Sequence, residues 1–413
     1  MAIKDLIEHS SKRREFLKTF AVGTAAAFTS IAPPSSRPDA QPQAPPPDKI
    51  RKNDMVYRRL GRTGLYISEI SLGGSPLPDE RLLFQLVERG INYIDTSDSY
   101  ENGNCERKVG RLFKAVGRDK IHIHARFHLE GPWTEASLIA SVEGSLRRLG
   151  TEQVEILGIH GVEKPEHLTD ERILGAFEKL KGKYRFRGLT CHVNQHAVIP
   201  KAVESGLYDM VQIGYNVFDI QETEKEIKTY SDYLGESGIR KLIDLARSRD
   251  VGVTAMKVLK IGGRRQDLAA YNKGGPSLYP AMLKWALENE KLSAAVTEIL
   301  NEEEMKEDLG AVGLPLAPAE RRMLHAHVSA NAGSYCHSCG LCQLACSAGI
   351  RAADISRCLT YHESYGKRAR ARAEFAGLRP AIAACQDCGA CERACPYGLP
   401  VRMRTRRAEE LLA

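Results

Sequence analysis

Eight cysteines near the end of the chain have a spacing that could do redox chemistry. They form two runs with the same pattern, C-x2-C-x2-C-x3-C, whose members are Cys336, Cys339, Cys342 and Cys346, then Cys385, Cys388, Cys391 and Cys395. Three thiolates separated by two residues each can surround one face of a cubane cluster, while the fourth points away from it. The pattern therefore predicts that the chain binds two [4Fe-4S] clusters.

The three-residue spacing before the last cysteine of each run predicts which cysteines ligate which cluster. In two-cluster ferredoxins this fourth cysteine ligates the other cluster. The expected sets are Cys336, Cys339, Cys342 and Cys395 for one cluster, and Cys385, Cys388, Cys391 and Cys346 for the other. Pro396 after the second run fits the ferredoxin pattern, while Ser347 stands in that place after the first run. The alternative is zinc, which paired CxxC units also bind, but a four-thiolate zinc site has no need of evenly spaced triplets.

Three further cysteines, Cys105, Cys191 and Cys358, stand outside the two runs. A lone cysteine is usually a small buried apolar residue, and we expect this for all three. Cys358 is the strongest candidate for another role because it lies between the runs.

The N-terminal segment resembles a twin-arginine export signal. Arg13 and Arg14 stand in the sequence SKRREFLK, and residues 19–32 are apolar with no acidic residue. The alternative is the start of an ordinary amphipathic helix, but residues 32–47 contain seven prolines, which is typical of a linker. We therefore expect a signal over residues 1–32, a linker over 33–53, and a periplasmic or otherwise exported protein. It would stay at the membrane only where the signal is not cleaved.

The stretch of about 270 residues before the first cysteine run has the length of one (β/α)8 barrel. Short apolar runs alternate there with amphipathic helical stretches. We expect strands over residues 69–72, 93–95, 121–126, 154–159, 184–190, 210–215, 251–256 and 293–296. A hairpin over residues 56–65 would close the barrel floor. The expected fold class is α/β, with a TIM barrel over residues 54–330 and a small, mainly helical ferredoxin-type dicluster domain over 331–413.

Motifs at the predicted strands resemble those of the aldo-keto reductases. The sequence GINYIDTSDSY over residues 90–100 resembles the signature of that family, and the resemblance continues in ERKVG (106–110), ILGIH (156–160) and QIGYN (212–216). The resemblance covers residues 54–312, and the cysteine-rich extension resembles that of the iron–sulfur branch of the family. It implies hydride transfer between a nicotinamide and a small carbonyl or alcohol, with a tyrosine as proton donor.

The resemblance assigns roles to four residues beyond strand ends, where barrel active sites form. It implies that Tyr100 is the proton donor, Asp95 its supporting carboxylate and His160 the residue that orients the substrate oxygen. Arg126 replaces the lysine of the family; it would lower the pKa of Tyr100 but cannot relay a proton, because it stays protonated. The alternative for Asp95 and Arg126 is a purely structural buried ion pair. We expect ordinary structural roles for His122, His124 and His128.

The positions that would contact a nicotinamide depart from the family pattern. Gln212 is kept, but Thr190 and Cys191 stand where the family has serine and asparagine, and Met256 replaces the stacking aromatic residue. The last predicted strand leads into four glutamates within residues 298–304, which would repel a phosphate. We therefore expect NAD(P) binding to be weak or absent. The remaining basic candidates for a diphosphate are Lys257, Lys260 and the turn 262–265, unless these form a solvated loop.

Composition limits the choice of partners. The formal net charge is +7, and the cluster segment is rich in arginine without interleaved aromatic residues, a pattern that does not favour nucleic acid. An acidic electron-transfer protein, or the negatively charged clusters themselves, would explain this charge. The sequence thus predicts an exported oxidoreductase that exchanges electrons through its clusters. The alternatives are an NADPH-dependent reductase with structural clusters, and a non-catalytic redox or interaction protein on an inactive barrel.

Overall fold

The computed structural model describes residues 47–129, 132–192, 194–217, 238–259, 277–331, 336, 339–363, 366–395 and 397–413. The predicted export signal lies outside the described residues, as do most of the predicted linker, Lys260, the turn 262–265 and Pro396. No helix within the described ranges has both the length and the apolar character needed to cross a membrane.

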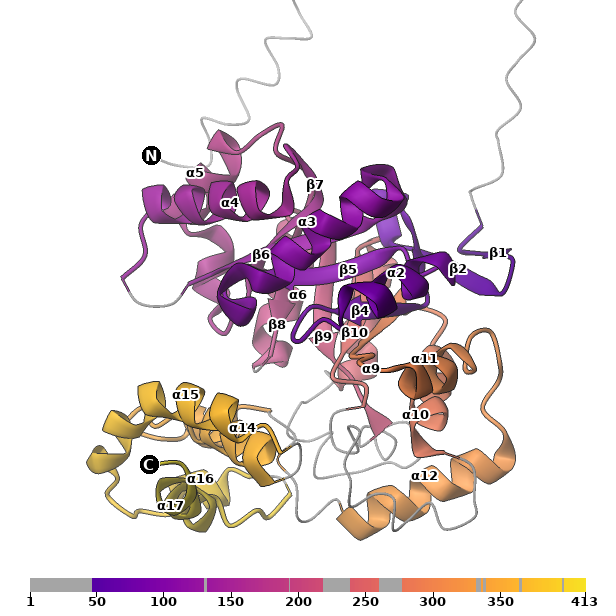
Figure 1. The fold of residues 1–413 in the computed structure, drawn as a ribbon. Helices are drawn as coiled ribbons and strands as arrows, with labels where there is room; N and C mark the ends of the chain where they lie inside the picture. The colour runs from indigo at the N-terminus through magenta and orange to yellow at the C-terminus, as the bar shows by residue number, and fades with distance from the viewer. Residues whose placement is uncertain are drawn as a thin grey trace, which may run out of the picture. The chain divides into compact units, whose positions relative to one another are not determined.

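Eight parallel strands close into a barrel in the order β10-β11-β4-β5-β6-β7-β8-β9 (Figure 1). They are β4 (Ile70–Gly73), β5 (Tyr93–Ser97), β6 (His122–His128), β7 (Val154–His160), β8 (Tyr184–Cys191), β9 (Met210–Gly214), β10 (Gly252–Met256) and β11 (Ala294–Thr297). Each begins and ends within two residues of its predicted bounds. The predicted (β/α)8 barrel is therefore confirmed.

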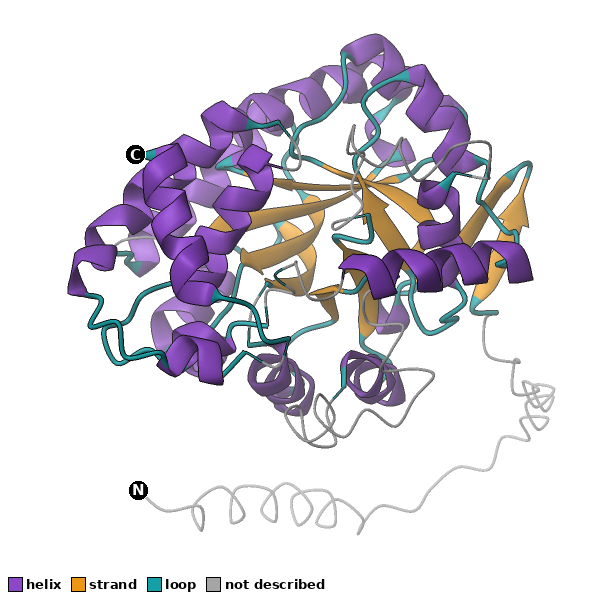
Figure 2. Ribbon diagram, turned by 90° about the horizontal axis from the view of Figure 1, so that it is seen from below, coloured by secondary structure: helices purple, strands orange, loops and turns teal. Residues whose placement is uncertain are grey.

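Helices surround the strands (Figure 2). They are α2 (Glu80–Glu88), α3 (Asn104–Val116), α4 (Glu135–Leu149), α5 (Glu171–Lys179), α6 (Gln195–Ser205), α9 (Ile239–Ser248), α10 (Leu278–Leu287) and α11 (Glu302–Leu309). Side-chain caps fix several helix starts: Asp79 accepts from the Leu82 amide at 2.8 Å, and Thr134 forms a capping box with Ser137. Because helices cover the sheet, the strands are apolar almost throughout.

The predicted hairpin closes the amino-terminal end of the barrel. It consists of β2 (Met55–Arg59) and β3 (Tyr66–Ser68), and β1 (Lys49–Lys52) adds a third strand that the sequence analysis did not predict. Leu60 packs against Tyr93 and Met210, which begin their strands. Gly61, with φ of +49°, lies so close to the backbone of Gly252 that a Cβ would stand 2.3 Å from its nitrogen.

After the barrel, α12 (Pro318–Asn331) packs along the barrel wall against α10. Leu324 and Val328 are buried in the barrel core, and Glu320 pairs with Lys284 at 2.8 Å.

The C-terminal region is an internal duplication with an offset of 49 residues, the distance from Cys336 to Cys385. In the first copy, α13 (Leu341–Leu344) is followed by α14 (Ala352–Glu363); in the second, α16 (Ala390–Arg393) is followed by α17 (Val401–Leu412). Helix α15 (Arg368–Leu378) and the short helix η8 (Arg379–Ala384) connect the copies. The region is therefore small and mainly helical, as predicted.

The two copies also share their backbone conformation. The glycine before each short helix has a positive φ, 85° at Gly340 and 71° at Gly389. The amide of each fourth cysteine donates to the residue three positions earlier, at 3.3 Å for Cys346 and 3.1 Å for Cys395. Each cysteine run thus folds as the same short unit.

Candidate functional site

Asp95, Tyr100 and Arg126 form one contact network at the carboxyl ends of β5 and β6. Arg126 Nε and Nη2 each lie 2.7 Å from a carboxylate oxygen of Asp95, and Nη2 also donates to the Tyr100 hydroxyl at 2.7 Å. Arg126 is 2% exposed and Asp95 5% exposed. The structure therefore brings together three of the four predicted catalytic residues.

Burial dominates the protonation of this network. It raises the pKa of Asp95 to about 6, although the charge of Arg126 opposes the shift. Burial also raises the pKa of Tyr100, and the neighbouring Arg126 does not outweigh it. Arg126 itself lowers the pKa of Tyr100 through its charge and its hydrogen bond, as expected, but desolvation of the phenolate is the larger effect.

His160, the fourth predicted residue, faces Tyr100 edge-on with 5.5 Å between ring centroids. Its Nδ1 lies 3.1 Å from Ser97 Oγ at the end of β5. Burial, helped by the charge of Arg126, lowers the pKa of His160 well below its ordinary value. The imidazole is therefore neutral at physiological pH.

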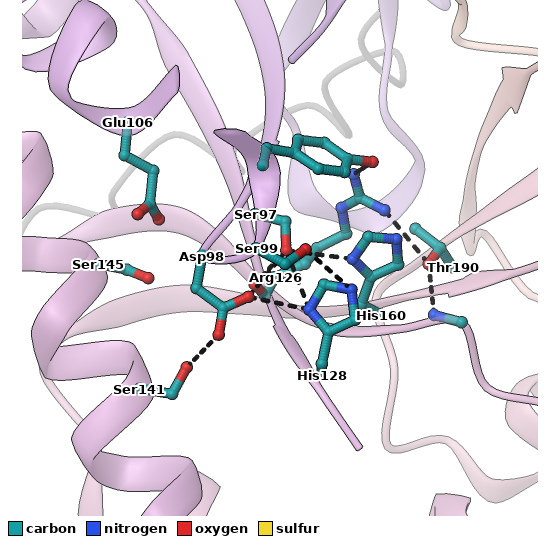
Figure 3. Close-up of polar contacts among 12 residues, drawn as sticks. Ser97, Asp98, Ser99, Glu106, Arg126, His128, Ser141, Ser145, His160 and Thr190 are labelled. Carbon is teal, nitrogen blue, oxygen red and sulfur yellow. Dashed lines mark hydrogen bonds and ion pairs between the residues drawn. The ribbon is translucent and has the colours of Figure 1, made fainter. Parts of the chain in front are cut away.

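A polar cluster that the sequence analysis missed lies behind His160 (Figure 3). The ring of His128 packs 3.9 Å from that of His160, and His128 Nδ1 lies 2.9 Å from Asp98 Oδ1. Asp98 also accepts from Ser97 at 3.0 Å and from Ser141 at 2.6 Å. Alternation along β6 was a usable signal, because residues two apart on a strand face the same side and His128 stands two residues after Arg126.

His124 lies next to this network on β6. Its Nδ1 lies 3.4 Å from Asp95 Oδ1, and the side chain is fully buried. Burial lowers its pKa well below the ordinary value. It therefore packs beside the carboxylate as a neutral ring.

The residues expected around a nicotinamide are mostly buried and engaged with the protein. Gln212 Nε2 lies 3.3 Å from Asp95 Oδ2, and Thr190 Oγ1 accepts from the Gly161 amide at 2.8 Å. Cys191 is fully buried, Met256 is 8% exposed, and Lys257 is half-buried with a φ of +61°. The amide of Gln212 that would hold a carboxamide is thus directed at the catalytic carboxylate.

The start of α11, where the family resemblance would seat a phosphate, is filled by the protein's own groups. Asn301 caps the helix by accepting from the Glu304 amide at 2.9 Å, and Glu304 accepts from the Leu300 amide at 2.6 Å. Glu298 pairs with Lys367 of the C-terminal region at 2.9 Å. The Asn301 side chain and the Glu304 carboxylate thus already accept from two of the amide groups that an anion would use.

The C-terminal region covers the carboxyl end of the barrel. Arg370 Nη1 donates to Ser75 at 3.3 Å, and Lys367 reaches Glu298. The Asn194 amide donates to the Cys339 carbonyl at 3.4 Å, and Arg351 pairs with Glu163. Because the barrel residues in these contacts follow four different strands at their carboxyl ends, the cysteine-rich region caps the mouth that contains Tyr100.

Cysteines of the two runs lie close enough to interact electrostatically. Cys339 and Cys342 both interact with Cys336 and Cys395, Cys391 interacts with Cys346, and Cys342 also interacts with Cys391 of the other expected set. A cavity of about 210 Å³ is lined by the four cysteines of the second set, Cys346, Cys385, Cys388 and Cys391, among other residues.

No three His, Cys, Asp or Glu side chains in the described ranges are grouped closely enough to hold a metal ion between them.

The three remaining cysteines are fully buried. Cys358 packs with Ile355, Leu359 and Phe375 in the core of the C-terminal region, and burial raises its pKa to about 12. The structure therefore gives Cys358 the same core role as Cys105, and not the separate role for which it was the strongest candidate.

Comparison with known proteins agrees with this geometry. The model of the aldo/keto reductase family matches residues 78–329. Aldo-keto reductase AMT2 of Alternaria alternata is 26% identical over 343 residues, covering 67% of this chain and 92% of its own length. L-galactose dehydrogenase of Arabidopsis thaliana is 25% identical over 294 residues, covering 62% and 87%. The holo structure of aldo-keto reductase AKR11C1 from Bacillus halodurans has the same fold, with a TM-score of 0.51 and 23% identity over 66% of this chain and 96% of its own. The chain therefore belongs to the aldo/keto reductase family and is an oxidoreductase.

Proposed function

We propose that this oxidoreductase acts on a small carbonyl or hydroxyl compound and exchanges electrons through two [4Fe-4S] clusters. The observation that carries the proposal is the contact of the Cys339 carbonyl with the Asn194 amide. Asn194 follows His192, whose ring lies 5.4 Å from that of His160. The first cysteine run therefore reaches the loop beside the residue expected to orient the substrate.

The eight cysteines of the two runs would hold the clusters in the two sets defined by their spacing. When bound, the clusters would supply electron transfer in single-electron steps. The duplicated backbone supports this assignment, since the glycines at positive φ let each run bend tightly without a side-chain clash. The cavity beside the second set provides space for one cluster.

The residues present do not fit a nicotinamide cofactor well, although the family typically uses NAD(P). Gln212 is directed at Asp95, the start of α11 is filled by carboxylates, and Met256 cannot stack as an aromatic ring would. We therefore assign no hydride step through NAD(P).

The catalytic roles proposed for the barrel residues follow from their contacts. Tyr100 would donate a hydrogen bond to the substrate oxygen, and His160 would contact the same oxygen. Asp95 would hold Arg126, which in turn holds the Tyr100 hydroxyl. A small hydroxyl or carbonyl substrate agrees with the relative named L-galactose dehydrogenase.

An acidic electron-transfer protein is the partner that we propose for the second cysteine run. Cys385 and Cys388 are exposed, and the neighbouring α17 carries Arg402, Arg404, Arg406 and Arg407. Asp387 and Glu392 neutralise part of this charge. We further propose export by the twin-arginine route, on the motif around Arg13 and Arg14, which suits a chain that receives clusters before it leaves the cytoplasm.

The test is anaerobic purification followed by cofactor analysis. The proposal expects about eight irons and eight sulfides per chain, the content of two four-iron clusters, and a reduced cluster signal by electron paramagnetic resonance. Turnover of a carbonyl and alcohol panel should proceed with reduced methyl viologen or an oxidising dye and not with NADPH. Zinc in place of iron, or tight NADPH binding with NADPH-dependent turnover, would overturn it.

A further inference from the structure

A hydroxyl, an imidazole and a carboxylate follow one another in hydrogen-bond contact where β5 and β6 end. Ser99 Oγ lies 3.2 Å from His128 Nε2, and His128 Nδ1 lies 2.9 Å from Asp98 Oδ1. Figure 3 shows both contacts, one on each nitrogen of the ring. These three groups in this order are the ones that serine hydrolases use to make a hydroxyl nucleophilic, and they are recognised by geometry and not by their order in the chain.

The carboxylate of Asp98 fixes the tautomer of the imidazole. Its Oδ1 accepts from Ser97 at 3.0 Å, and its Oδ2 accepts from Ser141 at 2.6 Å. Burial opposes ionisation of this carboxyl group, but these hydrogen bonds and the contact with His128 outweigh it and lower the pKa of Asp98 to about 2. An ionised carboxylate can only accept hydrogen bonds. The one proton of a neutral His128 ring therefore lies on Nδ1, and Nε2 keeps a lone pair.

The hydroxyl of Ser99 is in a position to donate to that lone pair. Ser99 precedes the short helix η2 (Tyr100–Gly103), where a serine side chain ordinarily accepts from a backbone amide of the first turn. Here the side chain makes no such capping bond, and its oxygen lies beside His128 Nε2 instead. Ser99 is also exposed while the cysteine-rich region covers the barrel. A substrate can therefore reach a hydroxyl that is already paired with a base.

We propose that Ser99, His128 and Asp98 form a second active site, which hydrolyses small carboxylic esters. This activity goes beyond the proposed function and does not depend on it. Ser99 Oγ is the nucleophile, and His128 Nε2 is the general base that takes its proton. Asp98 is the positioning residue, because it holds the proton on Nδ1 and stabilises the imidazolium that forms. The backbone amide that follows the nucleophile, that of Tyr100, is the group assigned to the transient oxyanion.

The reaction balances with water as its only co-reactant. In the first half, a bond forms between Ser99 Oγ and the acyl carbon while the hydroxyl proton moves to His128 Nε2. The ester C–O bond then breaks, and the leaving oxygen takes that proton to become an alcohol. In the second half, water gives a proton to Nε2 and its oxygen bonds to the acyl carbon. The bond to Oγ breaks and Oγ recovers the proton, so ester and water become acid and alcohol with no electrons exchanged.

The surroundings of the base favour an uncharged acyl group. The ring of His160 packs 3.9 Å from that of His128, and Tyr100 faces His160 edge-on. Burial and the charge of Arg126 lower the pKa of His160 well below its ordinary value, so this neighbouring ring is neutral at physiological pH. An acyl group that carries a second carboxylate would meet the negative charge of Asp98 without a cationic ring to offset it. Acetyl esters should therefore react faster than succinyl esters.

The deciding experiment treats the complete, anaerobically purified chain with a fluorophosphonate, which forms a covalent bond with activated serine hydroxyls. We expect mass spectrometry of the peptides to locate the label on Ser99, and His128→Gln to prevent labelling although the serine is kept. Ser248→Ala is the matched control, because Ser248 is also exposed but its hydroxyl donates to the Leu245 carbonyl at 2.7 Å. This variant should label Ser99 as the parent does. An unlabelled Ser99 in the parent, or labelling at the parent rate in His128→Gln, would overturn the proposal.

Hydrolysis of 4-nitrophenyl acetate measures turnover. Ser99→Ala and Asp98→Asn should each lower kcat/KM roughly 10²–10⁴-fold, with the unfolding temperature near that of the parent. His128→Ala should regain part of its activity when imidazole is added, which a purely structural role would not allow. Equal hydrolysis by the parent and by Ser99→Ala would overturn the proposal. Because neither cluster nor nicotinamide takes part, this outcome is independent of the iron content that tests the proposed function.

Discussion

Arg126 makes contacts that a lysine could not reproduce from the same strand position. It contacts both carboxylate oxygens of Asp95 and donates a hydrogen bond to the Tyr100 hydroxyl, and its Nη1 lies 3.4 Å from Thr190 Oγ1. A guanidinium offers five donors in a rigid fork, whereas an ammonium is one point of charge. The replacement therefore fixes the geometry of the site and removes a group that could relay protons.

The hydroxyl of Tyr100 is expected to be essential. Tyr100→Phe keeps the ring against His160 and removes only the group that contacts the substrate oxygen. We expect turnover to fall roughly 10²–10⁴-fold, the usual contribution of a positioned proton-transferring group, while the iron content stays at the parent level. Measured activity within a few-fold of the parent would show that another residue makes this contact.

Asp95 should impose an acid limit on activity. Its pKa is raised to about 6, so the carboxylate is ionised above that pH and protonated below it. Protonation removes the negative partner of Arg126, and turnover should then fall roughly tenfold per pH unit below about 6. A pH profile of kcat tests this, with Asp95→Asn as the comparison, which should be slow and lack the acid limb. A parent profile that stays flat to about pH 5 would contradict the assignment.

Among the site residues, those that were predicted from the sequence all belong to a recognisable family motif. The family signature led to Asp95 and Tyr100, and the motif at the fourth strand led to His160. Ser97 and Asp98 lie inside the same signature, yet their role depends on His128 from the next strand. Contacts between strands depend on register, and here Ser97 pairs with Arg126 across β5 and β6. The sequence motifs alone did not contain that register.

At the scale of elements, the barrel strands were predictable because each is a short apolar run between amphipathic helices. Strand β1 was not, since its sequence KIRK is charged and mostly exposed and so lacks an apolar alternation. The duplication in the C-terminal region was also missed. Apart from the cysteines, its copies share little sequence, but the glycine pair Gly349 and Gly398 at the same offset was a usable signal.

Helix α12 should depend on two buried side chains, Leu324 and Val328, for its attachment to the barrel wall. Leu324 is fully buried in the barrel core. Leu324→Ala should therefore lower the free energy of unfolding by about 2–5 kcal/mol, through lost burial and the cavity left behind. Chemical denaturation measures the loss, and Arg322→Ala on the exposed side of the same helix is the control, with an expected change within about 0.5 kcal/mol. Equal effects of the two variants would show that α12 is not anchored in this way.

At the scale of the whole molecule, the cysteine-rich region covers the barrel mouth. It contacts the segments that follow four strands, through Ser75, Glu163, Asn194 and Glu298. Arg370 also packs over the ring of Tyr361 at 4.4 Å and interacts electrostatically with Tyr100. The cap thus contributes charge to the site that it covers, so the two halves of the chain are expected to work as one unit.

Export should depend on the two arginines near the N-terminus. Replacing Arg13 and Arg14 with lysine preserves the charge and the length of the segment but removes the paired arginines that a twin-arginine signal requires. We expect the folded protein to remain in the cytoplasm, as measured by fractionation of cells that produce the full chain. Lys18→Arg is a matched control outside the pair and should leave export unchanged. Export of the double variant at the level of the parent would refute the assignment of a twin-arginine signal.

The assignment of cysteines to clusters can be tested by comparing the spectra of variants that should lose the same cluster. If each fourth cysteine serves the opposite run, Cys395→Ser should give the same electron paramagnetic resonance spectrum as Cys336→Ser. Cys346→Ser should likewise match Cys385→Ser. Every variant should keep about four of its eight irons, because one four-iron cluster is lost. The electrostatic interactions of Cys339 and Cys342 with Cys395, and of Cys391 with Cys346, favour this exchange between the runs, whereas that of Cys342 with Cys391 does not distinguish the two arrangements. If Cys346→Ser instead matched Cys336→Ser, each run would hold its own cluster, and the duplicated units would be independent rather than interlocked.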